Sequence, residues 1–250
     1  MKNSLSKSQI ERFSRQLVLK NIGAKGQKKI LSSSILIVGI GGLGCPAAEN
    51  LVRAGVGTIG LIDNDIVNLS NIHRQSLFSS KDLKKSKVNV AAKKLREINP
   101  LTKIKTYKSR LNKNNIKKII KNYEIIVDGS DNFETKFLIN DYCLKLKKKL
   151  ISGAISKFDG HVFTFNFKDK KTASLKNFYK EKQISNDNFN CEFDGVIGTT
   201  ASIVGTTQAN EALKMIVGIG KNLKNQILII DLLNLNFRKV KFKKKWYKTK

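Results

Sequence analysis

A glycine-rich turn between two apolar segments constrains the fold of this chain more than any other feature of its sequence. Residues 34–38 (SILIV) are apolar almost throughout, as expected of a strand buried on both faces of a parallel sheet. The sequence GIGGLG follows at 39–44, and a helical pattern of apolar residues runs from Leu43 to Ala54. A second apolar strand, TIGLID, ends at Asp63. This order predicts a βαβ unit in which backbone N–H groups at the helix start can bind a phosphate.

Strands and helices continue to alternate after this unit, and the character of the strands changes near residue 161. The segment HVFTFNF at 161–167 alternates in polarity and is rich in aromatic residues, which is typical of an antiparallel strand with one buried face. We therefore predict an α/β fold, a Rossmann-like, doubly wound, mostly parallel sheet extended by antiparallel C-terminal strands. The further elements that we expect are helices at 86–98, 115–122, 134–149 and 198–218 and strands at 103–107, 124–127, 150–154, 226–232 and 237–242.

No internal repeat and no strong linker divides the chain, so we expect a single domain over residues 1–250. Arg12 and Arg15 precede the first strand, and their spacing of three places them on one face of a helix. Residues 168–190 are polar with little periodicity, which predicts a mobile excursion. The parts of the domain are an N-terminal helical arm (4–30), a nucleotide-binding core (34–154), a C-terminal part (155–243) and a basic tail (244–250).

The chain is strongly basic, with 48 Lys and Arg against 19 Asp and Glu and a formal net charge of +29. An excess of this size is typical of proteins that bind nucleic acid or an anionic surface. Only seven of the basic residues are arginine, however, and arginine is the residue that phosphate recognition favours. Lys, Asn and Ile share A/T-rich codons, so we interpret the lysines as a solvated surface rather than a nucleic-acid site. The same field would attract a nucleotide or an acidic protein partner.

Several absences indicate a cytoplasmic chain without a membrane partner. No apolar run reaches the roughly 20 residues that span a bilayer, and the start lacks the apolar stretch of a signal peptide. The chain has three cysteines, Cys45, Cys143 and Cys191. Three is a small and odd number, which argues against a disulfide framework, so we expect reduced thiols. Cys45 and Cys143 fall in predicted helices, where we expect them to pack as small apolar residues.

The spacing of the glycines and of the acid that follows them indicates a nucleotide. Gly39, Gly41 and Gly44 fit the pattern GxGxxG, with Gly42 as an additional glycine that opens the turn. Asp63 ends the second strand 24 positions after Gly39, where a carboxylate can bind ribose hydroxyls. On these residues alone, an NAD-dependent oxidoreductase is an alternative.

Polar residues after the second and fourth strands favour ATP with magnesium over a dinucleotide. Residues 63–78 (DNDIVNLSNIHRQSLF) place a dense polar cluster with Arg74 at the ligand edge of the sheet, whereas a nicotinamide ring needs apolar surface. Lys87 adds a second cation, and Asp131 can hold Mg²⁺ against phosphate oxygens. The nucleotide-binding residues that we predict are Gly39, Gly41, Gly42, Gly44, Asp63, Asp65, Ser70, Asn71, Ile72, His73, Arg74, Lys87, Asp131 and Asn132, with Asp131 as the Mg²⁺ ligand.

These residues, taken in order, resemble the MoeB/ThiF/HesA family of adenylyltransferases in the ubiquitin-activating-enzyme superfamily. The resemblance extends from about residue 10 to residue 240, and it is closest to members that act in molybdopterin synthesis. The segments that carry it are RFSRQ (12–16), GIGGLGCPAAENLVRAGVGTIGLID (39–63), NLSNIHRQ (68–75), KSKV (85–88), INP (98–100), GSDNFETK (129–136) and the helix at 208–215.

The resemblance implies ATP-dependent adenylylation of the C-terminal glycine of a small ubiquitin-like sulfur-carrier protein ending in Gly-Gly. Pyrophosphate would be released, in sulfur transfer of the molybdopterin or thiamine type. The resemblance places the α-phosphate near Gly41 and Gly42 and the ribose on Asp63. It also implies that Arg15 reaches the triphosphate from the other subunit of a homodimer. Around the phosphates it implicates Asn71, Arg74, Lys87 and Asp131.

The attacking group in this reaction is a carboxylate, which is already an anion. Catalysis would therefore consist of positioning and charge neutralisation, without a general base. The catalytic residues that the resemblance implies are Arg15, Arg74, Lys87, Asp131 and Cys191.

The chain departs from the family at its cysteines. Many members carry two CxxC pairs that bind structural zinc, and this chain has neither, so we expect no structural zinc and an excursion held by packing alone. Cys191 matches a position at which some relatives have a reactive cysteine, but Glu192 and Asp194 would raise the pKa of its thiol. A covalent role for Cys191 is therefore an open alternative.

Two other functions are compatible with the sequence. A tRNA-modifying, ATP-dependent dehydratase of the same superfamily also activates a carboxyl group, and the basic surface would suit tRNA. A non-catalytic binding module with a vestigial nucleotide site is a third interpretation. For the carrier-activating function, a separate sulfurtransferase is a further candidate partner.

Overall fold

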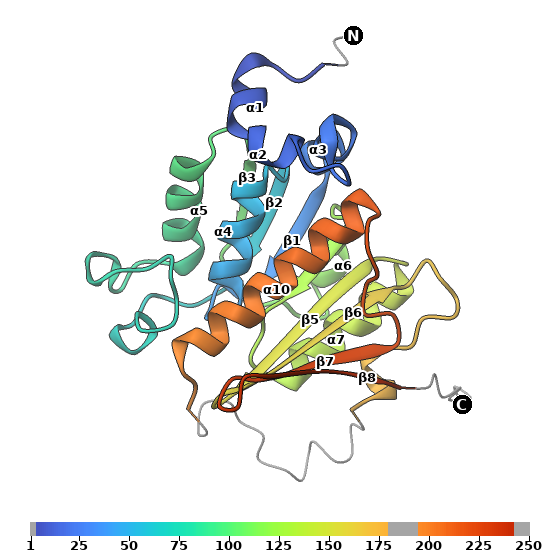
Figure 1. The fold of residues 1–250 in the computed structure, drawn as a ribbon. Helices are drawn as coiled ribbons and strands as arrows, with labels where there is room; N and C mark the ends of the chain where they lie inside the picture. The colour runs from blue at the N-terminus through green and yellow to red at the C-terminus, as the bar shows by residue number, and fades with distance from the viewer. Residues whose placement is uncertain (1–3, 180–194, 243–250) are drawn as a thin grey trace.

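The computed structural model describes residues 4–179 and 195–242, and Figure 1 shows the arrangement of their helices and strands. Eight strands form one sheet in the order β3-β2-β1-β4-β5-β6-β7-β8. Neighbours from β3 to β5 are parallel, and neighbours from β5 to β8 are antiparallel, so the predicted fold class is confirmed. The strands are β1 (Ser34–Val38), β2 (Thr58–Ile62), β3 (Lys103–Tyr107), β4 (Ile125–Asp128), β5 (Lys149–Ser156), β6 (Asp159–Asn166), β7 (Gln226–Asp231) and β8 (Asn236–Lys241).

Helices cover both faces of the sheet, because alternate residues of the central strands point into different cores. Ile35 and Ile37 of β1 belong to a core that α3, α4, α5 and α10 cover, whereas Leu36 and Val38 belong to a core that α6 and α7 cover. Figure 1 shows α4 and α10 side by side on the first of these faces. The helices are α1 (Lys7–Arg12), α2 (Ser14–Leu17), α3 (Gly23–Ser32), α4 (Gly44–Ala54), α5 (Lys87–Ile98), α6 (Ile116–Ile120), α7 (Phe133–Lys145) and α10 (Gly198–Val217), with short 3₁₀ turns at Leu69–Asn71, Ser80–Asp82 and Leu175–Asn177.

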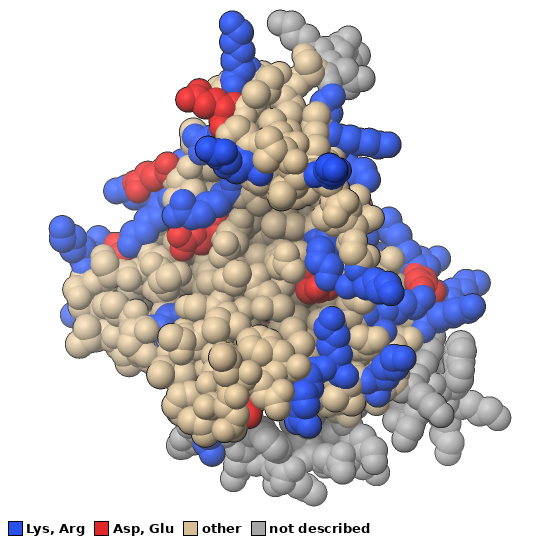
Figure 2. All heavy atoms as spheres, in the orientation of Figure 1, with Lys and Arg blue, Asp and Glu red and all other residues tan. Residues whose placement is uncertain are grey.

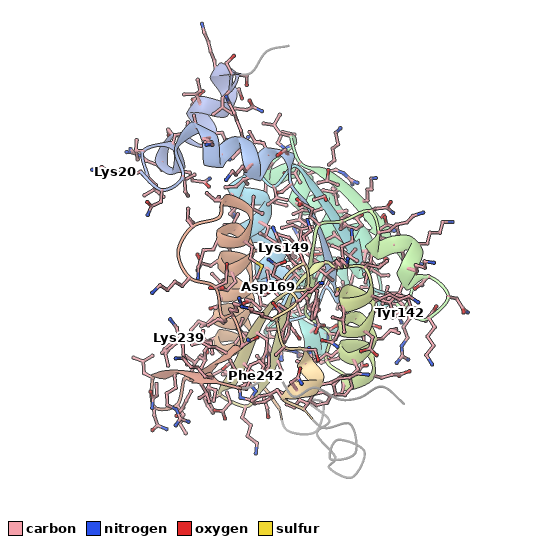
Figure 3. The ribbon with its side chains drawn as sticks, turned by 90° about the vertical axis from the view of Figure 1, so that its right-hand side faces the viewer. Lys20, Tyr142, Lys149, Asp169, Lys239 and Phe242 are labelled. Carbon is pink, nitrogen blue, oxygen red and sulfur yellow. The ribbon has the colours of Figure 1, made fainter. Side chains whose placement is uncertain are left out.

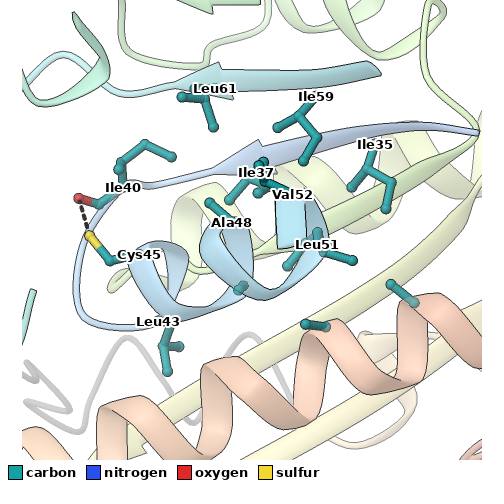
Figure 4. Packing of buried hydrophobic residues seen from close by; sticks show 14 of the residues in the cluster. Ile35, Ile37, Ile40, Leu43, Cys45, Ala48, Leu51, Val52, Ile59 and Leu61 are labelled. Carbon is teal, nitrogen blue, oxygen red and sulfur yellow. Dashed lines mark hydrogen bonds between the residues drawn. The ribbon is translucent and has the colours of Figure 1, made fainter. Parts of the chain in front are cut away.

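The turn from β1 into α4 depends on two glycines. Gly39 has a φ of +82°, a left-handed conformation that glycine adopts without a Cβ penalty. A Cβ on Gly44 would collide with the carbonyl oxygen of Gly39, so the first turn of α4 sits directly against the end of β1. In Figure 4, Cys45 lies at the start of α4, and a dashed line joins its Sγ to the carbonyl oxygen of Ile40, 3.7 Å away.

Cys45 and Cys143 are both completely buried, which confirms that they pack as small apolar residues. Burial raises the pKa of the Cys45 thiol to about 12, and burial likewise raises the pKa of Cys143. Neither thiol is therefore a nucleophile near neutral pH.

The N-terminal arm is helical, but the expectation that Arg12 and Arg15 share one helix face is wrong. The helix breaks at Phe13, so that Arg12 ends α1 and Arg15 lies in α2. Phe13 lies at this break with its ring packed next to Gly55, and it is only 1% exposed. Arg12 donates a hydrogen bond from Nη1 to the carbonyl oxygen of Ile98 at 3.0 Å, while Arg15 is exposed.

The expectation that the excursion is held by packing alone is wrong for residues 168–179, the part that the structure describes, whereas its mobility stays a prediction. Asp169 forms an ion pair with Lys224 at 2.5 Å, and the side chain of Asn225 accepts a hydrogen bond from the backbone N–H of Ala173 at 2.8 Å. Figure 3 shows the side of the molecule on which Asp169 and Phe242 lie. Aromatic rings add to these contacts, in a cluster of Phe163, Phe178, Tyr179 and Phe242.

The surface is basic, as its composition predicts. Figure 2 shows Lys and Arg side chains spread over the visible face, with few acidic residues between them. None of the helices in the described ranges combines the length and apolarity that crossing a membrane requires.

Candidate functional site

The carboxyl ends of β1, β2 and β4 open into a cavity of about 1080 Å³. Val38 is in register with Ile62 on one side and with Asp128 on the other, so the loops that follow these strands start from one edge of the sheet. Most of the predicted nucleotide-binding residues line this cavity: Gly39, Gly41, Gly42, Asp63, Asp65, Ser70, Asn71, His73, Arg74, Lys87, Asp131 and Asn132.

Two predicted nucleotide-binding residues and Arg15 do not line the cavity. Gly44 is buried against the carbonyl oxygen of Gly39, and its role is close packing of α4 on β1. Ile72 lies between the lining residues Asn71 and His73 but does not line the cavity itself. Arg15 lies in α2 and does not line the cavity of its own chain. Cys191 lies outside the described residues, so its covalent role stays a prediction.

The carboxylate of Asp63 is fixed at the end of β2 by two backbone donors. Oδ2 accepts a hydrogen bond from the N–H of Ile40 at 2.7 Å, and Oδ1 accepts one from the N–H of Asp65 at 2.8 Å. Burial raises the pKa of Asp63, while these two hydrogen bonds act in the opposite direction. The bond to Ile40 joins the carboxylate of Asp63 directly to the glycine turn.

The two predicted cations are held in place before any ligand binds. Lys87, only 5% exposed, begins α5 and forms an ion pair with Asp65, its Nζ lying 2.9 Å from Oδ2. Arg74 donates from Nη1 to the carbonyl oxygen of Ser70 at 2.8 Å, and the same atom lies 2.8 Å from Nε2 of His73. Asp65, which the sequence predicts as a nucleotide ligand, is therefore the counter-charge of Lys87 in this structure.

The start of α10 supports both the glycine turn and the arginine loop. A Cβ on Gly42 would lie 3.1 Å from Cβ of Ala201, and a Cβ on Gly198 would lie 2.5 Å from the carbonyl oxygen of His73. A residue far along the chain thus fixes the loop that carries Arg74. The small residues at the start of α10 are what allows this approach.

Asp131 adds a third carboxylate to the lining of this cavity, beside Asp63 and Asp65. It is exposed, and its Oδ1 accepts a hydrogen bond from Nδ2 of Asn132 at 3.1 Å. Among the described residues, no group of three or more His, Cys, Asp or Glu could hold a metal by itself. This donor set fits Mg²⁺, which takes one or two carboxylates together with water and substrate phosphates.

The sequence analysis did not identify Arg110 or a buried charge pair, and it included Gln75 only as part of the polar segment at 63–78. Arg110 follows β3 at the same sheet edge, and Gln75 is 3% exposed behind Gly41; both line the cavity. The position of Arg110 directly after a parallel strand is a signal that would have found it. The buried pair is Asp128 with Lys136, whose Nζ and Oδ2 lie 3.2 Å apart. No local pattern predicts that pair, because it requires the end of a strand and the first turn of a helix to meet.

The chain matches the model of the ThiF family over residues 13–248. It is 37% identical to the sulfur carrier protein adenylyltransferase of Thermus thermophilus over 238 residues, covering 94% of this chain and 88% of the relative. It is 41% identical to a probable molybdopterin-synthase adenylyltransferase of Porphyra purpurea, covering 92% of this chain and 60% of the relative. It is 39% identical to the adenylyltransferase and sulfurtransferase MOCS3 of Drosophila virilis, covering 97% of this chain and 53% of the relative.

Solved structures share the fold at lower sequence identity. The structure of E. coli MccB with ATP superposes with a TM-score of 0.82 and 22% identity, covering 94% of this chain and 72% of that chain. The structure of PaaA gives a TM-score of 0.82 with 21% identity, covering 97% of this chain and 76% of that chain. These similarities establish the architecture of the sheet and its helices.

Proposed function

Since this chain belongs to the ThiF family and is an adenylyltransferase like its curated relatives, we propose that it activates a small ubiquitin-like sulfur-carrier protein. The reaction would transfer AMP from ATP to the carboxylate of the carrier's C-terminal glycine and release pyrophosphate. The observation that carries this proposal is one cavity that brings together the glycine turn, Asp63, the two restrained cations and Asp131.

The nucleoside end of ATP would bind at Asp63. Its carboxylate is already oriented by the backbone N–H groups of Ile40 and Asp65, so it can accept hydrogen bonds from ribose hydroxyls without rearrangement. A phosphate would then lie at Gly41, where a Cβ would meet nothing closer than 3.8 Å. The open space at this glycine lets a ligand approach the backbone.

The cations Arg74 and Lys87 would neutralise the charge that builds on the phosphates. Because both are held by protein contacts, little reorganisation is needed when charge develops on the leaving pyrophosphate. Bound Mg²⁺ would add further neutralisation of phosphate oxygens from the side of Asp131. The attacking carboxylate needs no proton removed, so the protein's work is to position it in line with the α-phosphorus.

We propose that the active form is a homodimer in which Arg15 of one copy reaches the cavity of the other. Arg15 is exposed and is absent from the lining of its own cavity. An exposed cation on a helical arm is free to act on a second copy.

The proposed partner has its own chemical requirements. The carrier must present an extended C-terminus to the cavity, and an acidic carrier would be attracted by the chain's net charge of +29. The carrier, rather than this cavity, decides whether the reaction serves molybdopterin or thiamine synthesis. The carrier also decides whether a separate sulfurtransferase acts after adenylylation.

The test is ATP–pyrophosphate exchange with purified protein, Mg²⁺ and carriers of the molybdopterin and thiamine types that end in Gly-Gly. We expect exchange only in the presence of a carrier, and loss of that exchange in Asp131→Ala. Glu97→Ala is the matched control, because Glu97 is an exposed acid on α5 that does not line the cavity. Exchange that proceeds at the same rate without a carrier, or an active Asp131→Ala variant, would refute the proposal.

A further inference from the structure

A buried ion pair lies directly beneath the turn that carries Asp131. We propose that Asp128 and Lys136 are positioning residues, which hold Asp131 at the place where it meets Mg–ATP. The inference rests on the proposed function, because it takes Asp131 as the metal ligand of the site.

Asp128 is the last residue of β4, and its carboxylate is completely buried and fully engaged. Oδ1 accepts hydrogen bonds from the backbone N–H of Ser130 at 3.0 Å and from its hydroxyl at 2.5 Å. Oδ2 accepts from the hydroxyl of Ser152 at 2.6 Å and from Nζ of Lys136 at 3.2 Å. The carboxylate therefore ties the turn after β4 to the neighbouring strand β5.

Lys136 joins a third element to this cluster. It is the fourth residue of α7, is 4% exposed and donates from Nζ to the carbonyl oxygen of Gly153 at 2.6 Å as well as to Asp128. A single ammonium group thus connects α7 to the end of β4 and to β5. On the other side, Nε2 of Gln208 in α10 donates to the carbonyl oxygen of Asp128 at 2.8 Å.

Asp131 has little that holds it directly, so its position depends on the residues beside it. Ser130 is fixed by Asp128, and Asn132 caps α7 by accepting a hydrogen bond from the N–H of Thr135 at 2.9 Å. Asp131 lies between these two anchored residues, with its carboxylate exposed to the cavity. Lys136 anchors the same helix from within, so a shift of Lys136 would move both anchors together.

Stability of the fold does not by itself explain a buried ion pair. The free energy needed to take two charges out of water offsets much of their mutual attraction, and proteins with apolar residues in place of such a pair are often equally stable. A metal site, in contrast, depends on the residues behind its ligand, because they fix the orientation of that ligand. The pair is therefore better explained by the precise placement of Asp131 than by the stability of the fold.

The test measures binding of a non-hydrolysable ATP analogue by calorimetry, with and without Mg²⁺, together with thermal melting. For Lys136→Met we expect the Mg²⁺-dependent affinity to fall by about ten-fold or more, whereas the metal-free affinity changes little. Lys136→Arg should restore the Mg²⁺ dependence, because it keeps the charge and the donors. Lys145→Met is the matched control, at the exposed end of the same helix, and should bind as the wild type does.

A double variant separates positioning from folding. Asp128→Asn with Lys136→Met removes both buried charges, so its melting temperature should recover relative to Lys136→Met alone while its Mg²⁺ dependence stays weak. The inference is overturned if Lys136→Met keeps the wild-type Mg²⁺ dependence, if it loses metal-free and metal-dependent binding equally, or if the double variant recovers both properties together. A wild-type chain that binds Mg–ATP but shows no carrier-dependent exchange would instead refute the proposed function and leave this inference in place.

Discussion

Replacing Lys87 by methionine should separate the chemistry of the cavity from the stability of the fold. Lys87 is buried, but its counter-charge Asp65 has a side chain that is 57% exposed. Losing this pair leaves a carboxylate that water can solvate, so we expect the free energy of unfolding to change by about 1 kcal/mol or less. Methionine is unbranched and similar in length, so it should fill the same space.

The effect of Lys87→Met on the reaction should be much larger. The ammonium group is one of the preorganised charges that would stabilise the phosphates as pyrophosphate leaves. Removing one such group typically costs about 3 kcal/mol of transition-state stabilisation, a loss of about 10²-fold in rate. The assay is carrier-dependent ATP–pyrophosphate exchange, and chemical denaturation of the same sample gives the stability.

Lys94→Met, in the same helix, should lower stability and leave the reaction unchanged, which is the opposite of Lys87→Met. Lys94 lies 2.6 Å from Asp82, whose side chain is only 12% exposed, and neither residue lines the cavity. Leaving this carboxylate without its partner should cost about 1–3 kcal/mol of stability and leave exchange unchanged. An active Lys87→Met enzyme, or one destabilised as much as Lys94→Met, would refute this reasoning.

Three further predictions concern pH, the glycine turn and the dimer. Burial alone would raise the pKa of Asp82, but hydrogen bonds, first from Lys94, lower it from 3.8 to about 2, so the wild type gains stability above about pH 3.8 that is lost as the pH falls through 2. Acid denaturation followed by circular dichroism should therefore be shallower in Lys94→Met. Gly44→Ala should abolish soluble expression or lower the melting temperature steeply, because its Cβ has no room beside the preceding turn; a normal melting temperature would contradict this. Light scattering should give twice the chain mass of 28.1 kDa, and mixing inactive Arg15→Ala with inactive Asp131→Ala should recover part of the activity, which a monomeric enzyme could not do.

The sequence by itself determined the parts of the protein that depend on short segments. Apolar runs predict the buried strands, because a parallel sheet covered on both faces buries most side chains of its central strands. The glycine turn and Asp63 predict the nucleotide edge, because the carboxyl ends of neighbouring parallel strands meet there. Each of these inferences uses residues that are close in the chain or elements whose relative order the fold class fixes.

Tertiary structure decided which charges meet and which segments are held. The pairing of Lys87 with Asp65 and of Lys136 with Asp128 depends on distances between separate elements, which no periodicity encodes. The N-terminal arm breaks at the buried Phe13, and residues 168–179 are held by contacts with a segment some fifty residues away. Local patterns specify elements, whereas the pairing of polar groups is set only when packing brings those elements together.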